Sequence, residues 1–275
     1  MRNCTIVLAL FAAFVLALGT WAQAATIYSD DFSGNGANLN GTAPDTRPGT
    51  ETWASTTNNY FLDNGTVGWF DGSLPNPGAS GINGTSAAWL PFTPVAGKIY
   101  QVSADMTARA SGHHTNLSLG FAEFDAKTGY FQNTVNGYGH TRLYINLWTN
   151  PTGDGRTAPG VRDSGWSSFG SINRDQTYAI KTVFDAQDAN PANWTMEWFV
   201  DGSQVRVPTT ASSGSYADIH YVGFTAAENR THGTIDNLLL EDVTPADTVI
   251  PEPSTLVIWA LGLLGLLLVG RRRKR

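Results

Sequence analysis

The sequence predicts an all-β protein whose main domain is a two-sheet antiparallel sandwich. Apolar residues alternate with polar ones through the middle of the chain, with the period of a β-strand. Turn-forming dipeptides separate these stretches, and outside the two ends the sequence has no sustained apolar stripe of helical period. Packing two sheets face to face is the natural way to bury so many half-apolar strands.

Nine stretches show the alternation that indicates a strand. They are residues 27–32, 99–106, 117–121, 143–147, 178–184, 194–200, 205–207, 221–224 and 235–240. Residues 34–84 are rich in Gly, Asn, Thr and Pro, so we expect long loops and short edge strands there. Asp201-Gly202 is typical of a hairpin turn, because glycine takes a positive φ freely and aspartate tolerates it.

Charge and cysteine content limit the classes of function. The 275-residue chain has a formal net charge of −6, but residues 25–250 hold 11 Lys and Arg against 22 Asp and Glu, a net charge of −11. Such a domain repels phosphate backbones, so nucleic-acid binding is disfavoured. The single cysteine of the sequence is Cys4, in the N-terminal leader. The domain therefore lacks the residues for a disulfide, a zinc–thiolate site or a thiol nucleophile.

The first 24 residues have the three parts of a secretory signal peptide. Arg2 opens a short positive region, residues 6–18 are almost wholly apolar, and Ala22-Gln23-Ala24 supplies small residues at positions −3 and −1. We therefore expect cleavage before Ala25. An uncleaved membrane anchor is the alternative.

The C-terminal end predicts a second membrane segment. Pro251-Glu252-Pro253 precedes an apolar stretch, residues 255–270, and the basic tail Arg271-Arg272-Arg273-Lys274-Arg275. A helix of this length spans about 24 Å, a little less than the ~30 Å hydrocarbon core, and the basic tail keeps the upstream chain outside the cytoplasm. The two prolines keep Glu252 in extended chain and out of the following helix.

This arrangement resembles the PEP-CTERM sorting signal of Gram-negative bacteria. The resemblance implies recognition by an exosortase, a membrane-embedded cysteine transpeptidase, and loss of the hydrophobic tail. It also implies secretion across the inner membrane, a transient membrane anchor, and a final place at the cell surface or in an extracellular matrix rich in exopolysaccharide. A permanent single-span anchor is the alternative. The expected organisation is a signal peptide at 1–24, a β-sandwich at 25–243, a spacer at 244–250 and the sorting signal at 251–275.

Three short stretches of the middle region carry a second resemblance. Asp30-Asp31-Phe32-Ser33-Gly34, Trp198-Phe199-Val200-Asp201-Gly202 and Ile235-Asp236-Asn237-Leu238 are similar to the opening strand, a strand-and-turn and the closing strand of the concanavalin A-like or laminin G-like jelly-roll family. They frame residues 26–243. The resemblance implies a two-sheet jelly roll whose first and last strands lie side by side, and it implies that calcium sites are common.

Asp30, Asp31 and Asp236 are the candidate metal ligands. Carboxylates near the ends of neighbouring first and last strands can meet, although Asp31 and Asp236 are 205 positions apart in sequence. Ca²⁺ takes six to eight oxygen ligands from carboxylates and carbonyls, and a cation would stabilise a domain without disulfides. The alternative is that these aspartates are solvated turn residues or make loop hydrogen bonds.

The remaining candidates concern glycans. Trp148 and Trp166 flank a polar, glycine-rich stretch and are candidate platforms for stacking on sugar rings, with core packing as the alternative. Glu197 lies beside Trp198, but a glycosidase needs two carboxylates at a defined separation, and the compact Glu-x-Asp-x-x-Glu stretch of laminarinase-type enzymes is not in the sequence. We therefore expect no catalytic residues and a non-catalytic module that binds or accompanies polysaccharide. An atypical glycan-active enzyme and a purely structural coat or adhesion protein are the alternatives.

Overall fold

The computed structural model describes the middle of the chain and leaves both predicted signals outside the described residues. The described residues are 24–33, 38–55, 60–63, 66–69, 86–109, 115–122, 140–145, 160–162, 172–173, 175–210, 216–226 and 232–245. Residues 24–244 form one compact unit. Within the described residues, no helix is long and apolar enough to cross a membrane.

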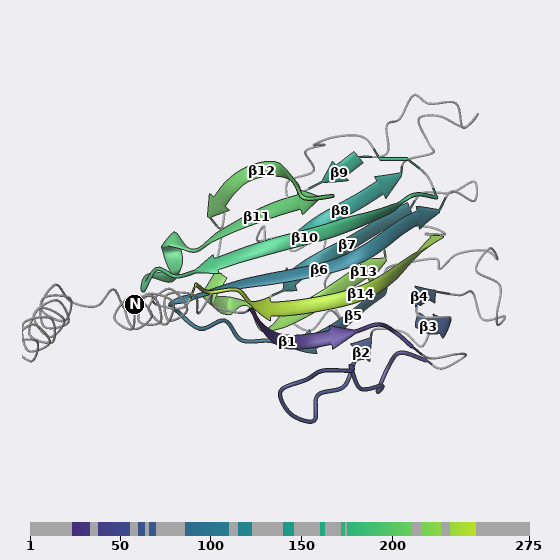
Figure 1. The fold of residues 1–275 in the computed structure, drawn as a ribbon, viewed down its shortest axis with the longest axis horizontal. Helices are drawn as coiled ribbons and strands as arrows, with labels where there is room; N and C mark the ends of the chain where they lie inside the picture. Colours follow the sequence, from purple (N-terminus) through teal and green to yellow (C-terminus); the bar gives the residue numbers. More distant parts are fainter. Residues whose placement is uncertain are drawn as a thin grey trace, which may run out of the picture. The chain divides into compact units, whose positions relative to one another are not determined.

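Two antiparallel sheets make up the described part of this unit (Figure 1). The eight-stranded sheet contains β1 (Ala25–Asp30), β3 (Tyr60–Asp63), β4 (Thr66–Trp69), β6 (Lys98–Arg109), β10 (Thr177–Ala186), β11 (Thr195–Val200), β12 (Ser203–Thr210) and β14 (His232–Asp242). The six-stranded sheet contains β2 (Ala54–Ser55), β5 (Ser86–Pro91), β7 (Thr115–Ala122), β8 (His140–Ile145), β9 (Gly160–Arg162) and β13 (Tyr221–Ala226). Two short 3₁₀ turns, η1 (Pro191–Asn193) and η2 (Tyr216–Asp218), lie in the connections.

The path of the chain is that of a jelly roll. β6 belongs to the larger sheet and β7 to the smaller one, the chain returns to the larger sheet at β10, and it crosses again at β13 and at β14. Every pairing of named strands in the described residues is antiparallel. The predicted two-sheet antiparallel jelly-roll sandwich is therefore confirmed.

Strand alternation builds the core between the sheets. In β10, every second residue from Tyr178 to Ala186 is buried, while Thr177 and Ala179 are exposed. Phe184 lies at the centre of an aromatic cluster, with ring centroids 5.5–6.2 Å from those of its neighbours. These neighbours are Tyr100, Phe121, Trp194 and Tyr216. Burying a side chain such as Phe184 contributes about 1.5–3 kcal/mol of transfer free energy, so the alternation seen in the sequence forms a real core.

The structure departs from the sequence-based expectation in two respects. The first strand ends at Asp30 rather than at Phe32, because Phe32 has a φ of 51° and leaves the sheet. β5 and β9 were not expected. β5 begins Ser86-Ala87-Ala88, which lacks the β-branched residues that make a strand recognisable, yet it lies between β2 and β13 in the smaller sheet.

Candidate functional site

The candidate site lies where β1 ends beside β14. The two strands pair antiparallel, with Ala25 opposite Asp242 and Asp30 opposite Leu238. In Figure 1 the purple β1 lies along the yellow β14. The expected adjacency of the first and last predicted strands is therefore observed, and it brings the end of β1 to the middle of β14.

Asp30 is a buried carboxylate with two hydrogen bonds. Its Oδ1 accepts from the backbone N–H of Phe32 at 2.8 Å, and its Oδ2 accepts from the indole N–H of Trp53 at 2.6 Å. Burial raises the pKa of Asp30 to about 6, although both hydrogen bonds act to lower it, and the nearby Asp45 and Asp31 raise it further. Asp30 thus anchors the loop that carries Trp53 to the end of β1.

Asp31 and Asp45 are exposed and lie directly beside Asp30. The backbone N–H of Asp31 donates to Oδ2 of Asp45 at 2.9 Å, and Oδ1 of Asp31 accepts from the backbone N–H of Ser33 at 2.8 Å. Hydrogen bonds from Ser33 hold the pKa of Asp31 below its usual value. One ligand oxygen from each of Asp30, Asp31 and Asp45 can be chosen so that all three lie within 4.8 Å of one another.

The loop that carries Asp45 is fixed by backbone hydrogen bonds. Ser29 and Thr46 form an isolated antiparallel bridge, with N–H to O distances of 3.2 and 3.1 Å. The loop is fixed a second time where the backbone N–H of Trp53 donates to the carbonyl of Thr42 at 2.8 Å. Phe32, Trp53 and Phe224 then pack together beneath it, with centroid separations of 5.3–6.1 Å. The three carboxylates are therefore held by ordered chain and not by a free loop.

Asp236 lies in a β-bulge of β14, opposite Asp105 of β6. The register between the two strands shifts between Asp236 and Leu239, and Asn237 takes the left-handed conformation with a φ of 51°. The side-chain amide of Asn237 donates to Oδ2 of Asp105 at 2.9 Å. Burial raises the pKa of Asp236, and the charges of Asp105 and Asp31 raise it further, whereas a backbone hydrogen bond from Asn237 lowers it.

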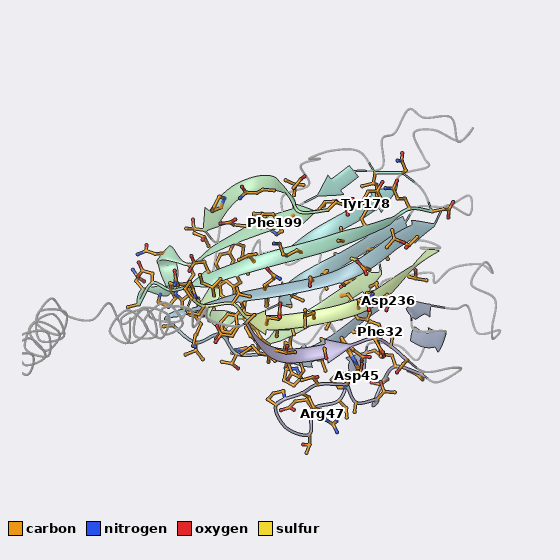
Figure 2. All side chains as sticks on the ribbon, viewed as in Figure 1. Phe32, Asp45, Arg47, Tyr178, Phe199 and Asp236 are labelled. Carbon is orange, nitrogen blue, oxygen red and sulfur yellow. The ribbon has the colours of Figure 1, made fainter. Side chains whose placement is uncertain are left out.

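Figure 2 shows Asp236, Phe32 and Asp45 along one line at this end of β1. Asp31 is close to both groups of carboxylates. It is grouped with Asp30 and Asp45, and its charge also raises the pKa of Asp236. The closest set of ligand oxygens, however, includes Asp45 in place of the expected Asp236. In the described part of the chain the single salt bridge joins Lys98 to Asp242 at 2.8 Å, so these carboxylates have no lysine or arginine partner there.

This arrangement suits a hard cation. Carboxylate oxygens are the preferred ligands of Ca²⁺, and several unpaired negative charges close together repel one another unless a cation or a proton lies between them. Sequence reasoning proposed Asp30, Asp31 and Asp236 and missed Asp45 and Asp105. Asp45 lies in an irregular stretch without strand period, so no local pattern links it to β1. Asp105 lies on a predicted strand, but only the bulged register places it opposite Asp236.

Two other candidates are explained by local structure. Asp201 and Gly202 connect β11 to β12, with φ values of 48° and 75°, so the predicted hairpin turn is confirmed. Glu197 lies on β11, and its Oε2 accepts from the side-chain amide of Gln204 on β12 at 3.1 Å. Two groups of predicted residues lie outside the described part of the chain. The first is the pair of candidate glycan platforms, Trp148 and Trp166. The second is the sorting signal, with Pro251-Glu252-Pro253, the apolar residues 255–270 and the basic tail of Arg271, Arg272, Arg273, Lys274 and Arg275.

Comparison of sequences identifies the C-terminal end. Residues 249–274 match the PEP-CTERM protein-sorting motif. The chain therefore carries this sorting motif. This confirms the prediction that the Pro-Glu-Pro triplet, the apolar stretch and the basic tail form a PEP-CTERM signal. No curated protein sequence matches the chain.

Several solved structures resemble the domain at low sequence identity. The carbohydrate recognition domain of Emp47p is 14% identical with a TM-score of 0.43, over 80% of this chain and 97% of that one. The carbohydrate-binding module CBM66 from Bacillus subtilis is 11% identical with a TM-score of 0.41, over 76% and 100%. The alginate lyase Aly36B is 12% identical with a TM-score of 0.40, over 68% and 84%. At these values the likeness concerns the β-sandwich and not an activity.

Proposed function

We propose that this chain is an exported surface or matrix protein, processed by an exosortase, whose β-sandwich is a non-catalytic module that associates with extracellular polysaccharide. The observation that carries the proposal is the PEP-CTERM motif at residues 249–274, which follows closely on the last strand of the sandwich. The proposal includes a Gram-negative host, which the resemblance to this class of signal implies. The signal peptide expected at residues 1–24 would direct the same chain across the inner membrane.

The proposal includes a structural calcium ion at the end of β1. Its support is the cluster of Asp30, Asp31 and Asp45, with ligand oxygens within 4.8 Å of one another, and the nearby Asp236. In this role Ca²⁺ would offset the repulsion between the carboxylates and fasten the loop of Asp45 to the strand pair. The ion would stabilise the fold and would take no part in a reaction.

The non-catalytic role is proposed from the hydrogen bonds of two acidic residues, Asp30 and Glu197. Asp30 has both oxygens in hydrogen bonds with Phe32 and Trp53, which suits a structural group more than a proton donor facing a substrate. Glu197 is hydrogen-bonded to Gln204, and this pair supplies one carboxylate where glycoside hydrolysis requires two.

Processing can be tested in cells that carry or lack an exosortase. The full chain and its Glu252→Ala variant are expressed in both, and the mass of the surface fraction is measured. We expect the wild-type chain to lose its C-terminal tail only in cells with the enzyme, and the variant to keep the tail in both. Glu241→Gln is the matched control, because it removes an acidic residue of β14 outside the motif. Equal processing of wild type and Glu252→Ala would contradict the proposal.

Association with polysaccharide needs a separate measurement. The surface fraction is treated with polysaccharide-degrading enzymes, and release of the processed protein is followed with an antibody. We expect release together with the polysaccharide and not with salt alone. Retention after complete removal of the polysaccharide would favour a structural coat protein instead.

A further inference from the structure

Both ends of the domain leave from the same end of the larger sheet. Ala25, the first residue of β1, lies opposite Asp242, the last residue of β14. Asp242 also lies opposite Tyr100, near the start of β6. In Figure 1, β6 accordingly begins where β14 ends. The two segments that the sequence assigns to the membrane, residues 1–24 and 255–270, are therefore attached at one end of the domain. We call it the exit end, and its described segments are residues 24–25, 91–98, 187–194, 216–220 and 242–244.

The last residues of the domain are fixed at the exit end. The backbone N–H of Val243 donates to the carbonyl of Ile99 at 2.9 Å, and the N–H of Ile99 donates to Oγ1 of Thr244 at 2.8 Å. Lys98 forms a salt bridge with Asp242, and Oδ1 of Asp242 accepts from the backbone N–H of Thr244 at 3.0 Å. The folded domain therefore extends to Thr244, and the chain that joins it to the apolar stretch starts there.

The joining chain is short compared with the domain. Thr255, where the apolar stretch begins, is 11 positions after Thr244. Even fully extended, a chain of this length reaches at most about 36–40 Å. β6 alone has 12 residues and is about 40 Å long. If residues 255–270 cross the membrane, the exit end is held close to the lipid surface. The opposite end can reach that surface only if the joining chain runs fully extended along the whole domain.

The exit end presents apolar residues that the core does not use. Val95 is 56% exposed, and no other large hydrophobic residue in the described part of the chain is so accessible. Ala96 follows it, and the loop that contains η1 adds Ala189 and Ala192, all of them exposed. One exposed valine needs no explanation by itself. Here, however, it lies at the end of the domain that the short joining chain keeps near the membrane.

The loop that carries Val95 is fixed by hydrogen bonds to its neighbours. The backbone N–H of Val95 donates to the hydroxyl of Tyr100 at 3.0 Å. The N–H of Gly97 donates to the carbonyl of the last residue of β10 at 2.8 Å, close to the loop of η1. The N–H of Phe92 donates to the carbonyl of His220, just after η2, at 2.8 Å. Val95 is therefore exposed in an ordered part of the chain.

The charge of the exit end favours a neutral lipid surface. Its segments contain one basic residue, Lys98, against Asp188, Asp218 and Asp242, and Lys98 is already paired with Asp242. Binding to anionic headgroups requires clusters of lysine and arginine, which these segments lack. Contact with a membrane at this end is therefore apolar, and anionic lipid should weaken it.

We infer that the exit end is the membrane-facing end of the precursor, and that the loop of Val95 contacts the lipid surface. The inference rests on the proposed function, in which residues 255–270 anchor the chain until an exosortase removes them. The joining chain keeps the loop at a high local concentration near the bilayer, so a small apolar contact is enough. Because membrane binding scales with the apolar area that is buried, the same contact is too small to hold the domain once the anchor is gone.

The test places an environment-sensitive NBD label on one introduced cysteine at a time. Cys4→Ser removes the single native thiol. The full chain is exported by cells that lack an exosortase and is reconstituted into phosphatidylcholine vesicles with a nitroxide on the lipid headgroup. Val95→Cys and Ala192→Cys carry the label at the exit end. Ser203→Cys is the matched control, because Ser203 is an exposed residue of the β11–β12 hairpin at the opposite end of the sheet.

We expect the nitroxide to quench the label at Val95→Cys and Ala192→Cys at least about twofold more than at Ser203→Cys. With the label at Ala192→Cys, a second substitution Val95→Asp should reduce quenching, and Val95→Trp should increase it, because an indole favours the interface and a carboxylate does not. Val95→Trp keeps the test decisive if Val95→Asp destabilises the domain. Anionic phosphatidylglycerol in the vesicles should reduce quenching at low salt.

Equal quenching at Val95→Cys and Ser203→Cys would overturn the inference. So would quenching at Ala192→Cys that neither substitution of Val95 changes. Quenching that appears only after an exosortase is added would show that this end contacts the enzyme and not lipid, which also overturns the inference. None of these measurements involves cleavage, so each of these results would leave the proposed processing standing. A chain that does not insert into vesicles at all would contradict both the inference and the anchored precursor of the proposed function.

Discussion

The indole N–H of Trp53 donates to the buried carboxylate of Asp30 across 2.6 Å, and this hydrogen bond joins the loop of residues 38–53 to the end of the first strand. Trp53 and Asp30 are both almost completely buried, at 1% and 6% exposure. A charged group so placed is held in a medium that favours its neutral form. The stability of this end of the sandwich therefore depends on pH and on any cation nearby.

The first prediction concerns pH in the presence of a chelator. The pKa of Asp30 is raised from 3.8 to about 6 by burial, so the folded protein binds more protons than the unfolded chain between these values. Protonated Asp30 therefore stabilises the folded state fully below pH 4, and this contribution is lost as pH rises through 6. After allowance for solvent screening, the free energy of unfolding should fall by roughly 2 kcal/mol over this range.

Chemical denaturation at several pH values checks this, with Asp30→Asn as the comparison. The free energy of unfolding of the wild type minus that of Asp30→Asn should fall by this amount from pH 3.5 to pH 7. The difference isolates Asp30 from the other acidic residues, whose pKa values shift in both directions. A difference that does not change with pH would show that Asp30 titrates normally.

The second prediction concerns calcium and thermal stability. If Ca²⁺ binds at Asp30, Asp31 and Asp45, a concentration of 100 times its Kd should raise the free energy of unfolding by about 2.7 kcal/mol and the Tm by roughly 5–10 °C. Excess chelator should reverse the shift. Asp45→Asn should lose it, whereas Asp188→Asn should keep it, because Asp188 is an exposed carboxylate used within its own loop by Asn190 and Asn193. No shift in wild type would remove the metal from the proposal.

The third prediction separates Asp236 from the nearer carboxylates. Asp236 is outside the closest group of ligand oxygens and faces Asp105 across the strands. Asp236→Ala should therefore weaken the calcium shift less than Asp45→Asn does, and in chelator it should leave the Tm unchanged or slightly raised, because one repelling charge is gone. Calorimetry of both variants with and without Ca²⁺ is the measurement. If Asp236→Ala alone abolished the shift completely, the ion would bind at the bulge of β14 and not at Asp30, Asp31 and Asp45.

The fourth prediction concerns the bulge itself. Asn237 has a φ of 51°, a conformation that costs an ordinary L-residue about 1–2 kcal/mol, and its amide donates to Asp105. Asn237→Gly should keep the conformation and lose only the hydrogen bond, whereas Asn237→Ala should lose both. We expect the alanine variant to be less stable than the glycine variant by about 1 kcal/mol in urea denaturation. The reverse order would show that the bulge is not strained.

The fifth prediction concerns close packing in the smaller sheet. A Cβ on Gly223 would lie 2.1 Å from the carbonyl oxygen of Ala88 and 2.8 Å from the Cα of Trp89. Both are backbone atoms and cannot move without shifting β5, so Gly223→Ala should cost about 3 kcal/mol or more. Gly49→Ala is the control, since its Cβ would meet only side-chain atoms of Glu51, the nearest a carboxylate oxygen at 3.0 Å. Thermal melts of the two variants should differ clearly, and similar melting temperatures would contradict the packing argument.

The fold was predictable because most of its core strands show alternating apolar and polar residues. In β10, Tyr178, Ile180 and Phe184 are the inward residues that the sequence indicates. β5 was missed because the pair Ala87-Ala88 is small on both faces, and its burial comes from neighbouring strands rather than from its own composition. Residue type alone therefore identifies strands whose own large apolar side chains form the core. It misses strands such as β5, which begins with small residues that neighbouring strands bury.

The candidate site was only partly predictable. The adjacency of Asp30 and Asp31 to the last strand follows from the topology of the family that the sequence resembles. Asp45 depends on one isolated backbone bridge, Ser29 to Thr46, which no sequence period encodes. The pairing of Asp105 with Asp236 depends on the register, and a bulge changes register without any marker other than an asparagine able to take a positive φ.

The place of β14 has a consequence for the order of events during export. One edge of β14 pairs with β6, and the other edge is shared by β1 and β4, so this strand joins the beginning of the domain to its centre. A chain that crosses a membrane from its N-terminus presents β14 last of all the described strands. The sandwich therefore cannot close until the residues just before the sorting motif have emerged. If an exosortase cleaves the chain as proposed, the fold would be completed and the motif exposed at nearly the same time, so that only a folded protein would be released.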